Sequence, residues 1–429
     1  MKKRPLTDIM NNEALDFALY TLHHRALPSM IDGCKPVHRF VLYSTLKDAK
    51  SEFAKVAALG SNVAKLGYNH GEVSAQDALK LMAAEWTNNL PLVAGRGNFG
   101  SRMIQDSAAA RYVYAKMHPN FPKYFKDIEL SPEHPDPEHV PPAFYVPVIP
   151  VVLVNGMLGI ATGYSTKIYP HDLDWVKKAV TEHLAGKEIS EPVVSWPCFD
   201  GEITYDGTKY TQHGTFDVSG LTAVVTEIPT TYDHPKYCAV LDKLVDEGKI
   251  SSWTDETSDT FQFRVRFKRG SNMTDDFIKK TLKLTKSFTP NVNVINQHNR
   301  LASYDDVRDL VKDFVDFRLE FLEDRISNGL KTSLRRSSLA DAKVHFIKSV
   351  IAGETILHGK TKAVLTKELS IQDNLKPYVS ELLAMTVDKM TSDEVKRLEK
   401  EANDARKEHE YWQKTTPKKE YVKDIKEIQ

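Results

Sequence analysis

Two tyrosines behind a run of small residues are the first candidates for chemistry. The segment SAAARYVYAK, residues 107–116, places Tyr112 and Tyr114 just after Arg111. A tyrosine phenol titrates at about 10 in water, so it needs a cation or a base to act as a nucleophile at neutral pH. A neighbouring guanidinium favours the phenolate and stabilises charge on the oxygens of a phosphate under attack. The pattern therefore favours phosphoryl transfer to a tyrosine, while ordinary packing of both rings stays open as the alternative.

A second set of candidates gathers cations near a helix start. The segment RALPSMIDGCKPVHRFVLYSTL carries Arg25, Lys35, His38 and Arg39 around an Asp-Gly turn and a proline that suits the first turn of a helix. A helix N-terminus favours anions and disfavours cations. A phosphate bound between these side chains would explain the clustering, and a solvated basic face without a ligand is the alternative.

Two turns between these segments are candidates for the same site. His70 lies in the turn NHG before a helical pattern, where it is free to donate to an anion, although such a histidine is more often a cap or a core residue. The stretch GRGNFGS, residues 95–101, has three glycines that let the backbone turn closely. We interpret it as a loop that supports the site, since the phosphate-binding pattern GxxxxGK[ST] is not met.

Phosphoryl transfer of this kind also needs a metal to assist the leaving oxygen. The segment SPEHPDPEHVPP carries residues of types that can ligate a metal, namely Glu133, His134, Asp136, Glu138 and His139. Its proline density predicts an extended, solvated surface loop instead. We therefore predict no metal site in this chain, which has no tight cluster of carboxylates suited to the reaction.

Composition limits the remaining possibilities. A chain of 429 residues is long enough for two to four domains, and its 58 basic residues equal its 58 acidic ones, so any basic surface must be local. Cys34, Cys198 and Cys238 lie far apart without CxxC spacing, which argues against disulfides and a thiolate zinc site. No signal-peptide core or long apolar run is present. We expect a soluble protein of the cytoplasm, without membrane partners.

The elements that must position these residues fall into three stretches. Residues 1–165 mix amphipathic helical segments with glycine-rich turns and end in the apolar run YVPVIPVVLVNGMLGIATGYS, which fits buried strands or strand–turn–helix junctions. Residues 166–300 alternate strand-like pieces, such as 221–229 and 260–268, with helical ones such as 236–249. The pattern predicts a multidomain α+β protein.

The last stretch, residues 301–429, is predicted to be helical. Apolar residues recur at spacings of three and four in two segments, which are Val307, Leu310, Phe314, Phe317 and Phe321, and then Val395, Leu398, Ala402, Ala405, His409 and Trp412. Two long helices with a compact helical cluster between them would form an antiparallel coiled-coil arm. A simple helical domain explains the same stripes.

Several motifs in a fixed order now make a resemblance visible. They are RALPSMIDGCKPVHRFVLY, YNHGE, GNFGS, SAAARY, IPVVLVNGMLGIATGYSTKIYPHDL and VVTEIP. In this order the chain resembles the DNA-cleavage subunit of type IIA DNA topoisomerases, the gyrase A-like family, over nearly its whole length. The mixture of eukaryote-like and gyrase-like motifs is most similar to the medium subunits of T-even-type phage topoisomerases.

The resemblance implies roles for particular residues. Tyr112 matches the nucleophile that becomes linked to a 5′ DNA phosphate, and Arg111 matches the arginine that stabilises the transition state. Ile160 matches the isoleucine that wedges between base pairs and bends DNA. Phe40 stands where gyrase-type sequences have a second arginine, so that contact is missing. The remaining expected DNA-binding residues are Arg25, Lys35, His38, Arg39 and His70.

The resemblance also implies a fold and an assembly. The fold is a winged-helix domain with the catalytic tyrosine (1–165), an α+β tower domain (166–300), and a long antiparallel coiled coil with a helical exit-gate domain that dimerises (301–429). The partners are double-stranded DNA, a second copy of this chain, and a large subunit whose ATPase and TOPRIM domains bind ATP and Mg²⁺. The chain would be inactive alone. It has no DNA-wrapping β-pinwheel after the coiled coil, so we expect relaxation, decatenation or unknotting.

Two other classes of function stay open on the sequence. A non-catalytic winged-helix DNA-binding or architectural protein with a dimerising arm would use Tyr112 only for structure. A different tyrosine transesterase, such as a recombinase, would need its own arginine and histidine pattern. Arg111, Tyr112 and Ile160 in register favour the topoisomerase over the first, and the order of the flanking motifs favours it over the second.

Overall fold

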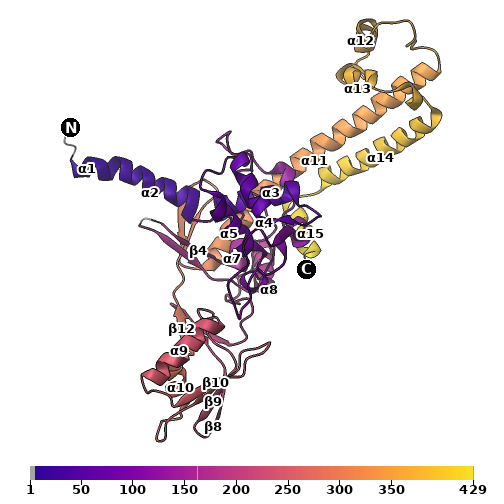
Figure 1. Cartoon of the computed structure of the whole chain (residues 1–429). Coiled ribbons are helices and arrows are strands. Elements are labelled where there is room, and N and C mark those ends of the chain that lie inside the picture. The colour runs from indigo at the N-terminus through magenta and orange to yellow at the C-terminus, as the bar shows by residue number, and fades with distance from the viewer. Residues whose placement is uncertain (1–4, 162, 429) are drawn as a thin grey trace. The chain divides into compact units, whose positions relative to one another are not determined.

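The computed structural model describes residues 5–161 and 163–428 (Figure 1). The chain divides into two compact units, Met1–Arg318 together with Asp424–Gln429, and Leu319–Lys423. None of the described helices is both long and apolar enough to cross a membrane.

The first unit begins with a helical segment that changes its hydrogen-bond pattern along its length. Two α-helical and two π-helical stretches follow one another without a break, namely α1 (Leu6–Ile9), η1 (Met10–Ala14), α2 (Leu15–Thr21) and η2 (Leu22–Ala26). Its end at η2 is fixed, because Leu22 packs with Leu27 and Ile295. Arg25 therefore lies on an anchored part of this segment.

Three helices and a small antiparallel sheet follow. Their bounds are α3 (Pro36–Asp48), β1 (Ala54–Lys55), α4 (Val56–Asn62), α5 (Glu72–Ala83), β2 (Val93–Arg96) and β3 (Tyr114–Met117). Pro36 is suited to the first position of α3 because its missing N–H needs no partner there. The helices pack on one another through buried residues such as Val41, Leu59 and Leu79. The sheet order is β1-β3-β2, so the strand that follows Tyr112 is its central strand.

The apolar run before residue 165 forms a short buried helix and a hairpin. After α6 (Asn120–Tyr124) the elements are α7 (Val151–Asn155), β4 (Met157–Ile160), β5 (Ser165–Ile168) and α8 (Leu173–Leu184). Gly156 joins α7 to β4 with φ +70°, and a Cβ there would lie 2.7 Å from the carbonyl oxygen of Ile168. Strands β4 and β5 pair antiparallel with Ile160 opposite Ser165. The predicted strand–turn–helix character of this run is confirmed.

Two further sheets and two helices form the α+β part. The elements are β6 (Glu202–Tyr205), β7 (Tyr210–His213), β8 (Phe216–Ser219), β9 (Thr222–Val225), α9 (His234–Asp246), β10 (Ser252–Asp255), β11 (Phe263–Arg266), α10 (Asp275–Thr281) and β12 (Thr285–Phe288). The sheet β10-β11-β9-β8 shares one core with both helices, through residues such as Tyr237, Leu241, Phe263 and Ile278. The strands expected within 221–229 and 260–268 and the helix within 236–249 are confirmed as β9, β11 and α9.

The hairpin of β13 (Val292–Ile295) and β14 (Leu301–Tyr304) leads into α11 (Val307–Ile351), which continues into the second unit. There α14 (Ser392–Lys414) lies antiparallel to α11. The side chain of Ser333 contacts His409, and Lys348 contacts Glu399. A Cβ on Gly329 would lie 2.5 Å from Trp412, so only glycine lets the ring approach this closely. Both predicted apolar stripes therefore lie on helices.

A small helical cluster connects α11 to α14. It contains α12 (Lys362–Ser370) and α13 (Val379–Leu383), and α15 (Pro417–Glu427) follows α14. The core of this helical cluster includes Phe346, Leu369, Leu375 and Leu382. The three-domain division at residues 165 and 300 stays a prediction.

Candidate functional site

Tyr112 lies on an exposed turn whose backbone is held in place. The Tyr112 N–H donates to the carbonyl oxygen of Ala109 at 2.9 Å. The carbonyl oxygens of Ala110 and Val113 each accept a backbone N–H from the start of α4 at 3.1 Å. The ring of Tyr112 is nevertheless 65 % exposed. The turn thus presents the phenol to solvent on a fixed support.

Arg111 lies directly against this phenol. Its guanidinium carbon is 4.7 Å from the centroid of the Tyr112 ring. Sequence neighbours on a helix or strand would point apart, but the turn Ala110–Tyr112 brings these two together. A cation held at this distance can reach a phosphate attacked by the phenol oxygen.

Tyr114 differs from Tyr112 in its surroundings. It lies in β3 opposite Lys55 and Arg96. Its half-buried ring packs under the guanidinium of Arg96, 4.8 Å from the ring centroid. A packing role suits Tyr114, and Tyr112 is the exposed nucleophile candidate.

The glycine-rich loop supports the segment before Tyr112. The carbonyl oxygen of Asn98 accepts the N–H of Ala108 at 3.0 Å, and Trp86 donates to the carbonyl oxygen of Phe99 at 3.2 Å. Residues 95–100 have the spacing GxGxxG, but an irregular segment follows them rather than a helix. The dinucleotide-binding fingerprint requires that helix, so the loop acts as a support.

The basic residues Arg25 and His70 form one group. Arg25 Nη2 lies 2.8 Å from His70 Nδ1, and Tyr20 Oη lies 3.0 Å from His70 Nε2. A guanidinium only donates, so Nδ1 accepts and the imidazole is neutral with its proton on Nε2. Burial and the Arg25 charge lower the pKa of His70 below its usual value, which agrees with a neutral ring.

Lys35 contacts the hairpin that carries Ile160. Lys35 Nζ donates to the carbonyl oxygen of Leu158 at 2.7 Å. Gly159 packs against η2, where a Cβ would lie 2.1 Å from the carbonyl oxygen of Ala26. Burial lowers the pKa of Lys35. At the end of β4 the Ile160 side chain is 87 % exposed, which is unusual for an isoleucine and makes it available to a partner.

His38 and Arg39 each form hydrogen bonds with other groups of the protein. The backbone N–H of Lys35 donates to His38 Nδ1 at 3.3 Å, and burial, together with the charges of Lys35 and Arg39, lowers the pKa of His38 to about 3. Arg39 Nε and Nη2 donate to the two carboxylate oxygens of Asp32 at 2.7 and 3.0 Å. The sequence interpretation missed Asp32, although an acidic residue inside so basic a segment was a visible signal.

A cleft of about 850 Å³ lies beside these side chains. Lys35, His38 and Leu158 line it, together with residues of α5, α7 and β5. In the described part of a single chain, no hydrogen bond, ion pair or ring contact joins Tyr112 or Arg111 to this cluster. Phe40 packs between Tyr68 and His139, with ring centroids 5.2 and 5.3 Å away, so it fills the core rather than the cleft.

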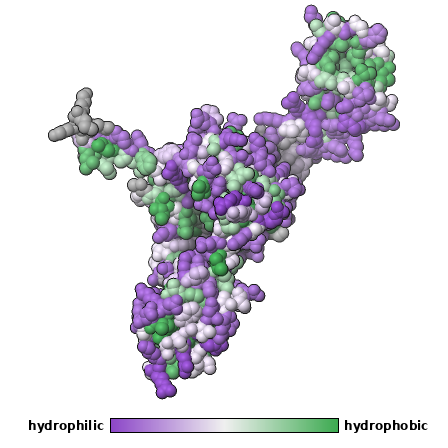
Figure 2. Space-filling view, in the orientation of Figure 1, coloured by the Kyte–Doolittle hydropathy of each residue, from purple (hydrophilic) through white to green (hydrophobic). Residues whose placement is uncertain are grey.

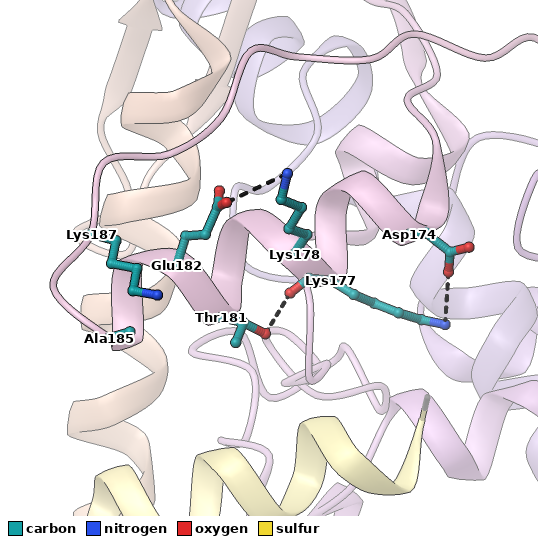
Figure 3. A pocket seen from close by; sticks show the side chains of 7 residues that line it. All are labelled: Asp174, Lys177, Lys178, Thr181, Glu182, Ala185 and Lys187. Carbon is teal, nitrogen blue, oxygen red and sulfur yellow. Dashed lines mark hydrogen bonds and ion pairs between the residues drawn. The ribbon is translucent and has the colours of Figure 1, made fainter.

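The charged face of α8 forms a separate hollow of about 420 Å³ (Figure 3). Two of its three lysines are paired along the same helix, since Lys177 lies 3.5 Å from Asp174 and Lys178 lies 3.6 Å from Glu182. Such pairs at helix spacing are typical of a solvated face, so we assign no ligand to it.

Candidate metal ligands do not gather around Tyr112. Within residues 5–161 and 163–428, one group of three His, Cys, Asp or Glu side chains comes together, and it is formed by His234, Cys238 and Asp255. In the predicted surface loop, His134 and His139 contact each other at 3.3 Å. The described residues near Tyr112 therefore do not fit a Mg²⁺ site of their own.

Comparison with known proteins identifies the family. Residues 25–428 match the sequence profile of the DNA gyrase/topoisomerase IV family, in its A-type subunits. The chain belongs to this family. It is 45 % identical to the DNA topoisomerase medium subunit of Enterobacteria phage T4, over 100 % of this chain and 99 % of that protein.

Eukaryotic relatives match over part of their length. The chain is 31 % identical to DNA topoisomerase 2 of Arabidopsis thaliana over 85 % of this chain and 26 % of that protein. The crystal structure of the Plasmodium falciparum topoisomerase II DNA-binding, cleavage and re-ligation domain superposes with a TM-score of 0.90 and 26 % identity, covering 98 % of this chain and 63 % of that one. The expected mixed α/β fold of a topoisomerase cleavage region is confirmed.

Proposed function

We propose that this chain is the DNA breakage–reunion subunit of an ATP-dependent type II DNA topoisomerase, with Tyr112 as the nucleophile. The observation that carries the proposal is the exposed Tyr112 phenol with the Arg111 guanidinium 4.7 Å from its ring, in a chain that matches a topoisomerase subunit over its full length. Cleavage of both strands by two such tyrosines opens a duplex through which a second duplex passes before religation.

The reaction at each strand is a transesterification. The Tyr112 oxygen, after loss of its proton, bonds to phosphorus, and the bond from phosphorus to the 3′ oxygen breaks. The 3′ oxygen takes up a proton and leaves, and the 5′ phosphate stays on the tyrosine. Arg111 stabilises the charge that develops on the non-bridging oxygens. Religation is the same exchange in reverse, so no phosphodiester energy is lost.

Magnesium and ATP belong to the partner polypeptide in this proposal. Mg²⁺ supplies charge stabilisation at the phosphate, and its ligands come from the TOPRIM domain of the large subunit, because the described residues near Tyr112 offer no carboxylate cluster. The same large subunit binds and hydrolyses ATP. The active site is completed only on assembly, in the cytoplasm of a bacterial host if the chain is phage-encoded.

Double-stranded DNA binds along the basic cluster and the β4–β5 hairpin. Arg25 and Lys35 contact phosphates, and neutral His38 and His70 serve as hydrogen-bonding groups rather than as charges. Arg39 positions the start of α3 through Asp32. The exposed Ile160 wedges between base pairs and bends the duplex.

A homodimer closes through the second unit. The element order from α3 to β3 is typical of a winged helix, and the antiparallel pair of α11 and α14 is the coiled coil that carries the exit gate. Figure 2 shows apolar side chains gathered on the helical cluster, where Ile351, Ile356, Ile371 and Val387 are each more than half exposed. A patch of this kind is typical of a protein interface.

The test is to trap the covalent intermediate. The chain is mixed with its large subunit, supercoiled DNA and Mg²⁺, the reaction is stopped with denaturant, and protein is sought on 5′ DNA ends. Tyr112→Phe should abolish the adduct and leave DNA binding nearly intact, whereas the matched variant Tyr114→Phe should retain it. Loss of the adduct in Tyr114→Phe alone would overturn the assignment, and DNA binding without any adduct in the wild type would favour an architectural protein.

A further inference from the structure

Three potential metal ligands converge on the α+β part of the first unit. His234 is the first residue of α9, Cys238 lies one helical turn later on the same face, and Asp255 ends β10. One ligand atom from each lies within 4.8 Å of the other two. His234 Nε2 is 2.7 Å from Asp255 Oδ2, and Cys238 Sγ is 3.8 Å from either ring nitrogen of His234.

Neighbouring groups hold two of these side chains, His234 and Asp255, in place. The Asp233 side chain caps α9 by accepting the Lys236 N–H at 3.0 Å, which fixes the turn that carries His234. The His234 ring stacks on Phe263, with centroids 5.5 Å apart, and Asp255 Oδ1 accepts the Thr257 N–H at 3.0 Å. The second carboxylate oxygen of Asp255 remains directed at His234. A ligand set held by a helix and a strand of one core is preorganised.

We infer that His234, Cys238 and Asp255 form a site for a divalent transition metal, with Zn²⁺ as the best match. Imidazole nitrogen, thiolate sulfur and carboxylate oxygen are the donors that Zn²⁺ takes in proteins, with bonds of about 2.0 to 2.3 Å. A tetrahedron with such bonds separates its ligand atoms by about 3.3 to 3.6 Å. Metal binding therefore needs side-chain rotations in which the His234–Asp255 contact lengthens from 2.7 Å and the Cys238–His234 contact shortens from 3.8 Å.

The fourth position of this site faces solvent. The His234 and Asp255 side chains are 25 % and 37 % exposed, so a water molecule can complete the tetrahedron. Asp242 lies one further turn along α9 but accepts a hydrogen bond from Trp253 Nε1 at 2.9 Å, outside the group of three. It adds negative charge next to the site, and coordination releases the thiol proton of Cys238 to solvent.

A bound metal would link α9 to β10. Because α9 also contacts the segment before Tyr112, the metal would help to hold that segment in place. The backbone N–H of His234 donates to the carbonyl oxygen of Met103 at 2.8 Å, and Lys236 Nζ donates to Gln105 at 3.1 Å. Met103 and Gln105 belong to the segment that leads to the catalytic turn. Metal binding is expected to raise the melting temperature of the chain, and the inference does not depend on DNA cleavage.

The test uses Co²⁺ as a spectroscopic probe on the purified full chain after chelator treatment. A cobalt–thiolate charge-transfer band should appear with one equivalent of Co²⁺ and disappear when Zn²⁺ is added. Cys238→Ser should abolish the band. Cys198→Ser should keep it, because Cys198 is exposed and outside the cluster.

His234→Gln and Asp255→Asn should each weaken Co²⁺ binding at least about tenfold. Melting curves without metal serve to show that all variants fold. A wild-type protein that gives no band overturns the inference. A band that persists in Cys238→Ser also overturns the inference, because the sulfur ligand would then come from another residue.

Discussion

Arg111 and Arg39 are both arginines of the predicted DNA site, but their surroundings are opposite. Arg111 is exposed and rests on the ring of Tyr112. Arg39 is 13 % exposed and forms two charge-assisted hydrogen bonds with Asp32, whose side chain is fully buried. Asp32 also accepts the backbone N–H groups of Cys34 and Tyr145, at 2.9 and 3.1 Å.

The two arginines differ in whether their charge is available to a ligand or is used within the fold. An exposed side chain on a fixed turn contributes little to folding, so its whole charge is available to a substrate. A buried ion pair costs desolvation and is strongly coupled to the fold, because removal of one partner leaves the other charge uncompensated. The same residue type can therefore serve chemistry at one position and architecture at another.

The largest expected effect is on the rate of DNA cleavage, on substitution of Arg111. Arg111→Ala should lower the rate of DNA cleavage by the assembled enzyme about 10² to 10³-fold, because one preorganised group that stabilises the transition state is lost. The melting temperature should stay nearly unchanged. Single-turnover cleavage and a thermal melt measure both, and a variant that melts early would show that Arg111 is structural.

Asp32 should show the reverse pattern. Asp32→Asn removes the charge that compensates Arg39 and should destabilise the chain by about 3 kcal/mol. The exposed pair of Glu410 and Lys414 provides the matched control, and Glu410→Gln should cost less than about 0.5 kcal/mol. Urea unfolding measures both variants, and equal losses would refute the contrast between buried and exposed pairs.

Ile160 should affect DNA shape rather than folding. Ile160→Ala removes the apolar wedge and should reduce DNA bending and cleavage by about tenfold, since unstacking a base step costs a few kcal/mol that the wedge offsets. Val218→Ala, in β8 and 41 % exposed, is the control and should bend DNA normally. Energy transfer between dyes at the two DNA ends measures the bend, and unchanged bending by Ile160→Ala would contradict the proposal.

The smallest effect is expected from His38 and depends on pH. Its pKa is about 3 in the folded chain, chiefly through burial, and about 6.5 when unfolded. The unfolded state therefore binds more protons between these values, so the stabilisation is complete above pH about 6.5 and is lost as the pH falls. At pH about 5.5 the loss is on the order of 1 kcal/mol.

His38→Gln should reduce the slope of stability against pH in this window. His171 supplies an internal comparison, since burial lowers its pKa to about 4 and its share of the slope should remain. Denaturant unfolding at several pH values measures the slope. An unchanged slope in His38→Gln would mean that His38 is not buried as a neutral ring.

Local patterns predicted much of the fold. The apolar spacing of residues 307–321 predicted the start of α11, and the alternating segments predicted β9 and β11, because these periods follow from backbone geometry. The two long helices of residues 301–429 were also predicted, and they are α11 and α14. The changes of helix type before residue 27 were not predicted, since they depend on packing against distant segments.

The candidate site was predicted in part. The dipeptide Arg111-Tyr112 and the motif order around it indicated a tyrosine nucleophile. His234 and Cys238 were missed as a pair, although their spacing of four at the start of the predicted helical segment 236–249 was visible. Asp255 could not have been added, because the pairing of β10 with β11 is needed to bring it to α9.

The sequence by itself determined the family, the periodic helices and strands, and the identity of the residues that can react. Only the tertiary structure decided which of the basic side chains remain available to a ligand. Arg39 and His38 are drawn into the protein by Asp32 and by burial, whereas Arg111 stays beside an exposed phenol. The physical reason is that charge and pKa depend on solvent and on neighbours brought together by folding, which sequence distance does not report.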